Sequence, residues 1–179
     1  MDSRCLRVQC SNQWYDIDFS EVIKERKKYY FNTQTYTMIE GDIRNLSCLD
    51  HINKGNAIVV MEGVSMYLKK KELLDFFELL NDHFTNVHIL IDTYTIFAAK
   101  VSKYKNPIND VGVTEVYGLD NPRDLEVLDI KYIKEHSITP KTKIDELKRI
   151  EKIIFKNLFA GKISKTMYRL YEYRKDVYE

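Results

Sequence analysis

Four short runs rich in β-branched, aromatic and other apolar residues lie in the first half of the chain, at 13–18, 35–39, 56–61 and 87–91. Each run is predicted to form a strand. The third, NAIVVM, is almost continuously apolar, which is typical of a strand covered on both faces. Ser20 is expected to open a helix that reaches about residue 28, and 68–84 carries apolar residues at helical spacing. Strands that alternate with helices predict an α/β domain with a parallel sheet.

The second half continues this pattern less regularly. Asn121 and Pro122 are expected to begin a short helix, and 130–138 is expected to form an edge strand. The period of the apolar residues predicts one continuous helix over 144–159, and alternation over 167–173 predicts a final strand. A chain of 179 residues without an internal repeat suits one domain, so we expect a single domain over 1–179.

Acidic residues follow the predicted strands. Asp18, Asp42, Glu62 and Asp92 all fall at or just beyond the carboxyl end of a strand, which is the edge where open α/β sheets bind ligands. At such an edge a carboxylate accepts hydrogen bonds from both hydroxyls of a ribose, and Asp18 is the candidate for that role. The alternative is that each carboxylate only caps the following helix, as Asp18 is placed to do just before Ser20. Repetition across successive strands favours a ligand site.

Composition excludes several other classes of function. The chain has 28 basic and 27 acidic residues, so no net field attracts nucleic acid or an anionic membrane. No stretch approaches the roughly 20 apolar residues of a membrane span. Cys5, Cys10 and Cys48 are odd in number and lack metal-ligand spacing, and the four histidines are scattered singly. We therefore expect a soluble, cytoplasmic protein that acts on a small molecule and requires no metal.

Four blocks of sequence resemble, in the correct order, the leucine carboxyl methyltransferase superfamily, which includes the tetracenomycin-type polyketide O-methyltransferases. The blocks are WYDIDFSEVI at 14–23, EGDIRNL at 40–46, VMEGVSMYL at 60–68 and YGLDNPRDL at 117–125. The closing YRLYEY at 168–173 is similar to the last strand of that family. The resemblance covers nearly the whole chain.

The resemblance implies a Rossmann-like class I methyltransferase sheet with helices on both faces and S-adenosylmethionine as the cofactor. The implied reaction moves its methyl group to a carboxylate or hydroxyl oxygen of a small molecule or metabolite, chiefly by aligning donor and acceptor. The resemblance implies that Asp18 holds the ribose, that Asp42 and the backbone of Ile43 lie against the adenine, and that Glu62 lies beneath the methionine end. Tyr67 would line the substrate side. No catalytic base is identified.

The start of the chain departs from the family pattern. Residues 1–4 match only the tail of the family's glycine-rich loop, where Asp2 would contact the cofactor, so the resemblance implies a sheet without its first strand and that loop. We expect this chain to bind the cofactor weakly or not at all, and the alternative function is a non-catalytic remnant or interaction subunit. Unpaired strand edges are costly. A second copy, a complementing chain or direct pairing of the strand ending at Asp18 with the strand ending near Glu62 would satisfy them.

Overall fold

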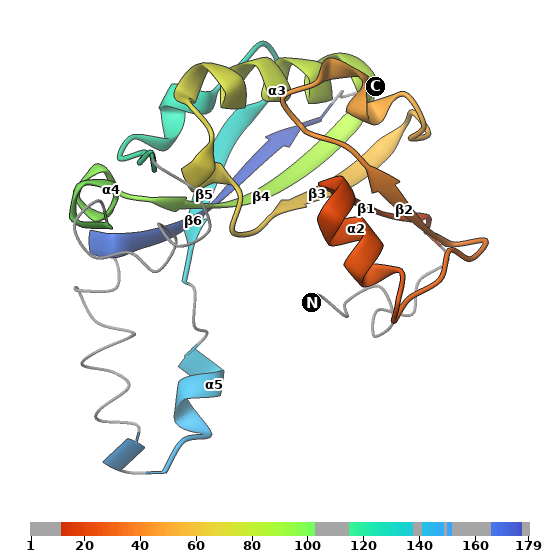
Figure 1. Ribbon diagram of the computed structural model, residues 1–179. Helices are drawn as coiled ribbons and strands as arrows, with labels where there is room; N and C mark the ends of the chain where they lie inside the picture. The colour runs from red at the N-terminus through yellow and green to blue at the C-terminus, as the bar shows by residue number, and fades with distance from the viewer. Residues whose placement is uncertain (1–11, 103–114, 138–140, 149, 152–165, 177–179) are drawn as a thin grey trace. The chain divides into compact units, whose positions relative to one another are not determined.

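The computed structural model describes residues 12–102, 115–137, 141–148, 150–151 and 166–176. These residues belong to two compact units, Met1–Asn53 and Lys54–Glu179, and each is considered by itself (Figure 1). The expectation of a single domain over 1–179 stays a prediction. In the described part of the chain, no helix has the length and apolar character needed to cross a membrane.

The first unit is a strand, a helix and a second strand. β1 (Trp14–Asp18) and β2 (Tyr36–Glu40) pair in parallel, with Asp18 opposite Glu40, and α2 (Ser20–Arg26) connects them. The two predicted strands and the predicted helix are confirmed, although α2 ends about two residues early. Apolar side chains from all three elements form a small core that contains Ile23, Tyr36 and Met38, with Trp14 and Tyr30 packed against it.

A buried ion pair fastens α2 to both strands of the first unit. Arg26 is 7% exposed, and its Nη2 lies 2.5 Å from Oδ2 of Asp16 in β1. The Nε of Arg26 donates to the hydroxyl of Tyr36 in β2 (2.8 Å), and that hydroxyl donates to Asp16 (2.6 Å). Because a seven-residue helix is marginal alone, these contacts and the packing of Ile23 keep α2 in place. Burial raises the pKa of the Tyr36 hydroxyl far above its ordinary value.

The second unit is built on a four-stranded sheet with the order β3-β4-β6-β5. β3 and β4 are parallel, whereas β6 runs antiparallel to both of its neighbours. The four strands predicted here are confirmed, and β5 is an edge strand as expected. Their bounds are Asn56–Met61 for β3, Asn86–Tyr94 for β4, Lys131–His136 for β5 and Tyr168–Lys175 for β6.

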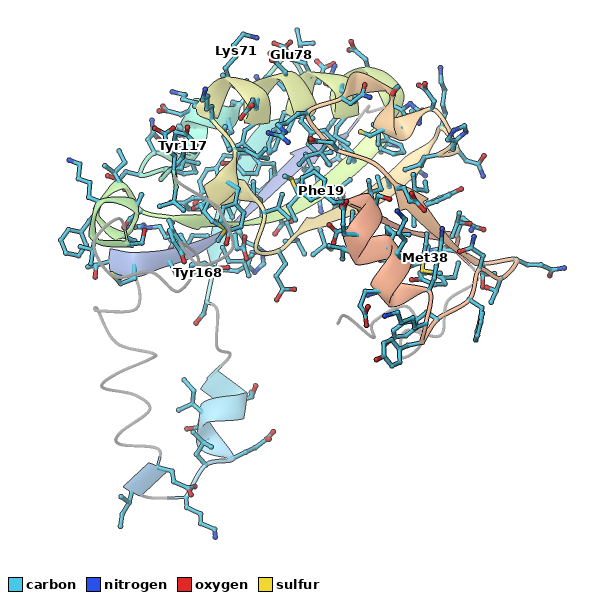
Figure 2. All side chains as sticks on the ribbon, in the orientation of Figure 1. Phe19, Met38, Lys71, Glu78, Tyr117 and Tyr168 are labelled. Atoms are coloured by element: carbon cyan, nitrogen blue, oxygen red, sulfur yellow. The ribbon has the colours of Figure 1, made fainter. Side chains whose placement is uncertain are left out.

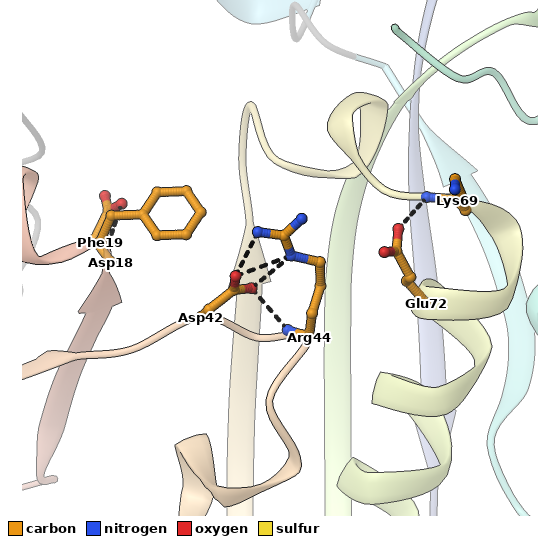
Figure 3. Close-up of polar contacts among 6 residues, drawn as sticks. All are labelled: Asp18, Phe19, Asp42, Arg44, Lys69 and Glu72. Carbon is orange, nitrogen blue, oxygen red and sulfur yellow. Dashed lines mark hydrogen bonds and ion pairs between the residues drawn. The ribbon is translucent and has the colours of Figure 1, made fainter. Parts of the chain in front are cut away.

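The helix α3 (Lys70–His83) covers one face of this sheet (Figure 1). At its start, the backbone N–H of Lys69 donates to the carboxylate of Glu72 at 2.7 Å (Figure 3). The rings of Phe77 and Tyr173 meet edge to face, with their centroids 5.1 Å apart. The buried apolar residues of α3 and of the strand face beneath it include Leu73, Phe76, Phe77, Leu80, Val87, Ile89, Ile91, Tyr171 and Tyr173. The predicted helix over 68–84 is thus confirmed.

The expectation that the strand at 56–61 is covered on both faces is wrong. β3 lies at the edge of the sheet that the described residues of this unit form, and Ile58 and Val60 are 73% and 44% exposed. These two residues pair with His88 and Leu90, whereas the buried Val87, Ile89 and Ile91 lie on the opposite, α3-covered face. A continuous apolar run does not distinguish an edge strand from a central one, because neighbouring strands decide the burial of both faces.

One further expectation needs correction. The helix predicted over 144–159 is interrupted in its described part: α5 (Lys141–Asp145) ends at Asp145, and the N–H of Leu147 bonds the carbonyl of Ile144, three residues back. Residues 150 and 151 are helical again, whereas 149 and 152–159 lie outside the described residues. Filling of the open strand edges, whether by a second copy, by a complementing chain or by direct pairing of the strand ending at Asp18 with the strand ending near Glu62, stays a prediction. Within its own unit, β1 pairs with β2 and β3 pairs with β4.

The structure also contains three short 3-10 helices, η1 (Leu46–Leu49), η2 (Ser65–Tyr67) and η4 (Pro122–Leu125), and η4 begins at the predicted proline. In addition, the α-helix α4 (Ile96–Ser102) follows β4.

The end of α3 is anchored by a buried amine. Lys175, the last residue of β6, is 9% exposed, and its Nζ donates to the carbonyl oxygens of Asn81 (2.6 Å) and Phe84 (3.0 Å). Carbonyls at the end of a helix lack partners within the helix and carry its partial negative charge. The amine of Lys175 therefore satisfies two groups that are buried away from water.

We expect Lys175→Met to lower the free energy of unfolding by about 1.5–3 kcal/mol, the range for hydrogen bonds to a charged group. Methionine keeps the apolar stem, so the loss reports the amine and not the packing. Urea denaturation followed by circular dichroism measures the change. Lys131→Met, at an exposed position of β5, is the control and should stay within about 0.5 kcal/mol. Equal effects of the two substitutions would contradict the anchoring role.

Candidate functional site

Asp18 is the last residue of β1 and is exposed. Its Oδ1 accepts the backbone N–H of Phe19 at 2.8 Å (Figure 3), whereas α2 has Phe19 as its N-cap and no side-chain capping bond. The carboxylate therefore stabilises the turn between strand and helix and does not cap the first turn of α2. Within the described residues, Oδ2 of Asp18 has no hydrogen-bond partner. One carboxylate oxygen is open to a ligand.

The loop after β2 lies against the end of β1. The carbonyl oxygen of Asp18 accepts the N–H of Gly41 at 2.9 Å, and Asp42 follows directly. The carboxylate of Asp42 is held by Arg44, which donates through its backbone N–H (2.9 Å), its Nε (2.9 Å) and its Nη2 (2.5 Å) (Figure 3). These bonds hold the pKa of Asp42 below its ordinary value. Ile43 is half-buried between the two.

The first unit thus brings Asp18, Asp42 and Ile43 together at the carboxyl ends of β1 and β2. The backbone N–H of Ile43 has no hydrogen-bond partner in the described part of the chain, in contrast to the N–H of Arg44 beside it. This edge offers one carboxylate acceptor and one backbone donor. Such a pair is suited to a polar ligand that has both hydroxyl donors and a ring nitrogen acceptor.

In the second unit, Glu62 is the first residue after β3 and is exposed. Gly63 follows with φ of 71°, in the left-handed region that glycine adopts without strain. The N–H of Gly63 donates to both carboxylate oxygens of Asp92, at 3.0 and 2.8 Å. A residue of β4 therefore fixes the turn that follows β3.

Asp92 does not lie at the end of a strand as expected, because β4 continues for two residues beyond it to Tyr94. Its side chain is 4% exposed, the hydroxyl of Tyr168 donates to its Oδ2, and the hydroxyl of Ser65 donates to its backbone carbonyl. Burial raises the pKa of the Asp92 carboxyl above its ordinary value, and the hydrogen bonds from Tyr168 and Gly63 oppose that shift. Burial also raises the pKa of the Tyr168 hydroxyl, as does its bond to Asp92.

Three tyrosines gather near this turn. Tyr67 of η2 is 37% exposed, and its pKa is raised by partial burial and, to a smaller extent, by Tyr94. The rings of Tyr94 and Tyr168 meet edge to face with centroids 5.7 Å apart, and Tyr168 is labelled in Figure 2. The parallel ladder of β3 and β4 and the antiparallel start of β6 produce this cluster. Sequence reasoning identified Tyr67 but missed Tyr94 and Tyr168 as site residues, since tyrosines at strand spacing are usually core.

The segment before η4 is tied to the same region. The N–H of Tyr117 donates to the carbonyl of Met66 (2.8 Å), and the N–H of Leu119 donates to the carbonyl of Tyr94 (2.7 Å). A Cβ atom on Gly118 would lie 2.4 Å from the carbonyl oxygen of Thr95, so only glycine permits this approach. The sequence block at 117–125 thus lies beside the ends of β4 and η2.

The roles expected for the site residues stay predictions. Asp2 lies outside the described residues, so its expected cofactor contact stays a prediction. Asp18, Asp42 and Ile43 lie in the first unit, and Glu62 and Tyr67 lie in the second. Among the described residues, no group of three or more His, Cys, Asp or Glu side chains is arranged to hold a metal ion.

Known proteins similar to this chain are methyltransferases, although no family model matches it. Over 129 residues it is 27% identical to the tetracenomycin polyketide synthesis O-methyltransferase TcmP of Streptomyces glaucescens. The aligned region covers 70% of this chain and 48% of that protein. Over 142 residues it is also 27% identical to the S-adenosyl-L-methionine-dependent methyltransferase dpfgK of Gibberella zeae, with the same coverage of 70% and 48%. The chain spans about half the length of these curated relatives.

A solved structure is similar in fold. A proposed methyltransferase from Thermobifida fusca superposes with a TM-score of 0.63 and 11% sequence identity, over 92% of this chain and 64% of that one. The described strands and helices therefore have the Rossmann-like α/β fold of a methyltransferase, as predicted. The sequence resemblance to methyltransferases of the tetracenomycin type is likewise confirmed by the two relatives.

The Tyr168–Asp92 bond gives a prediction about ionisation. Because the hydroxyl of Tyr168 stabilises the charged carboxylate, Tyr168→Phe should raise the pKa of Asp92 further above its ordinary value of 3.8. Carbon-13 NMR of the aspartate carboxyl groups against pH measures it. Tyr94→Phe is the control, since Tyr94 packs against Tyr168 and does not bond Asp92.

The same shift has a consequence for stability. A carboxyl whose pKa is raised by folding stabilises the folded state fully below its unfolded pKa, and that contribution is lost as the pH rises through the folded value. Asp92→Asn should therefore remove a fall in unfolding free energy that begins above about pH 3.8. An unchanged pH profile would contradict this assignment.

Proposed function

We propose that this chain carries cofactor-binding and substrate-side residues of an S-adenosylmethionine-dependent O-methyltransferase. The acceptor is a carboxylate or hydroxyl oxygen of a small molecule or metabolite. The names of the two curated relatives and the methyltransferase fold support this proposal. Because the chain spans about half of each relative, the reaction of the whole protein is part of the proposal.

The single observation that carries the proposal is the open carboxylate oxygen of Asp18 at the carboxyl end of a parallel strand. A ribose presents two neighbouring hydroxyls, and a carboxylate accepts from both. The turn into α2 is already held by the other oxygen, so binding a ribose requires no rearrangement of Asp18. This donor and acceptor chemistry fits the nucleoside part of the cofactor.

The loop after β2 fits the adenine less completely. The N–H of Ile43 is available to donate to a ring nitrogen, and it lies two residues after Gly41, which contacts the end of β1. The carboxylate of Asp42 is engaged by Arg44, so it meets the adenine only as part of that ion pair. We therefore assign the direct hydrogen bond to Ile43 and the shaping of the loop to Asp42 and Arg44.

The second unit is assigned the other contacts. Glu62 takes the methionine end, and Tyr67 lines the substrate side together with Tyr94. When bound, the cofactor supplies a methyl group already activated by its sulfonium. The residues of this chain then need only orient it, a contribution from proximity. A hydroxyl acceptor additionally requires a base.

A second candidate function is that of an interaction subunit, and the free edge of β3 favours it. β3 pairs only with β4 among the described strands, and its six residues include no charge and no proline. Ile58 and Val60 are exposed on one face of this edge. Edges of this kind take up another strand unless they are protected. A second copy of the chain or a complementing chain would add a strand beside β3.

Titration with S-adenosylhomocysteine, followed by nitrogen-15 NMR, tests the cofactor proposal. We expect saturable binding weaker than micromolar, with shifts at the amides of Phe19 and Ile43. Asp18→Ala should weaken binding by about 1.5–3 kcal/mol and Asp18→Asn by less, since asparagine keeps one acceptor. Asp50→Ala, at an exposed carboxylate in the same unit, is the matched control. Equal affinities of the Asp18 and Asp50 variants for S-adenosylhomocysteine would mean that Asp18 has only a structural role.

Light scattering coupled to size-exclusion chromatography tests the interaction candidate. The chain is expected to self-associate as its concentration rises, and Ile58→Lys should abolish this because a charge at the edge opposes strand addition. Ile133→Lys changes a 46% exposed isoleucine of β5, the opposite edge strand, and should leave association intact. A constant monomer mass for the unsubstituted chain would rule out the second copy as the partner.

A further inference from the structure

Asp92 has no part in the contacts proposed above, yet it is a buried carboxylate close to them. Its partner across the β4–β6 ladder is Leu170, and Leu90 lies two residues before it on the same face of β4. A buried carboxylate costs free energy unless hydrogen bonds replace its water. The donors that replace water come from two other segments, the turn after β3 and the start of β6.

The bond to Gly63 has a specific geometric effect. The N–H of Gly63 belongs to the peptide group that joins Glu62 to Gly63, and this group is planar. Because that N–H points at both oxygens of Asp92, at 3.0 and 2.8 Å, the orientation of the peptide plane is restrained. The orientation of a peptide plane limits the backbone angle ψ of the residue before it. Asp92 thereby restrains the direction in which the side chain of Glu62 projects from the backbone.

The turn is held from its other side as well. The hydroxyl of Ser65, two residues after Gly63, donates to the backbone carbonyl of Asp92. The hydroxyl of Tyr168 donates to Oδ2 and keeps the carboxylate from rotating away. Gly63 and Ser65 are therefore both tied to Asp92 of β4, which lies 29 residues after Gly63 in the chain.

We propose that Asp92 is a positioning residue, which acts through the Gly63 amide to hold Glu62 in the orientation that meets the cofactor. Its effect on the cofactor rests on the function proposed above, whereas its effect on the turn does not. An aspartate that served only to stabilise the sheet would not influence the affinity for a nucleoside ligand once the variant is folded. This difference makes the two roles separable.

The test compares Asp92→Ala and Asp92→Leu with Asp92→Asn in the full chain. Asparagine keeps an oxygen that accepts from Gly63, and its amide donates to the oxygen of Tyr168, so it should rescue the turn. Thr93→Ala is the control, because Thr93 is equally buried and its hydroxyl has no partner among the described residues. The readouts are the chemical shift and hydrogen exchange of the Gly63 amide, and the affinity for S-adenosylhomocysteine.

We expect Asp92→Ala to move the Gly63 amide proton upfield, to accelerate its exchange and to weaken S-adenosylhomocysteine binding by about tenfold. Asp92→Asn should restore all three, and Thr93→Ala should leave them unchanged. If the alanine variant does not fold, Asp92→Leu, which keeps the branched shape of the side chain without its oxygens, gives the same comparison.

The possible failures are distinct. An unchanged Gly63 amide in folded Asp92→Ala or Asp92→Leu overturns the positioning role. A displaced amide with unchanged affinity overturns its link to the cofactor and leaves the proposed function standing. No binding by the unsubstituted chain overturns the proposed function, and with it the role of Asp92 toward the cofactor.

Discussion

Parallel pairing of consecutive strands is the constraint on which the rest of the structure depends. In β1–β2 and in β3–β4, both strands of a pair end at the same edge, so the loops that follow them meet. This explains why Gly41 contacts the end of β1 and why Gly63 reaches Asp92. Without that shared direction, the polar residues that follow each strand would lie at opposite ends of the sheet.

Buried polar contacts then determine the local geometry. Arg26, Asp16 and Tyr36 tie the helix α2 to the strands of the first unit, and Asp92 ties a turn to a strand in the second. Burial of such groups is unfavourable by itself, and it is offset only when every group has partners. Hydrogen bonds have defined directions, whereas apolar contacts do not. These networks therefore fix orientations that the small apolar cores leave undetermined.

Local sequence pattern was sufficient to predict most elements, because each strand and helix has its own period of apolar residues. It failed where burial depends on neighbours, as at Ile58, and where a turn interrupts the period, as at Leu147. Asp92 was misplaced since Thr93 and Tyr94 extend the strand without a change in pattern. Tyr168 was missed as a site residue because its partner Asp92 lies 76 residues away in the chain. No local pattern indicates that β6 pairs antiparallel with β4.

The position of β6 has a consequence for how the protein acquires its structure during synthesis. β6 is the last strand of the described chain, yet it lies inside the sheet, between β4 and β5. β5 pairs with no described strand other than β6, so it cannot join the sheet until residues 168–175 have left the ribosome. Contacts of such long sequence separation slow folding and leave strands exposed meanwhile. Until then β4 lacks the strand that covers its second edge in the described sheet, so the backbone groups that later bond to β6 stay exposed.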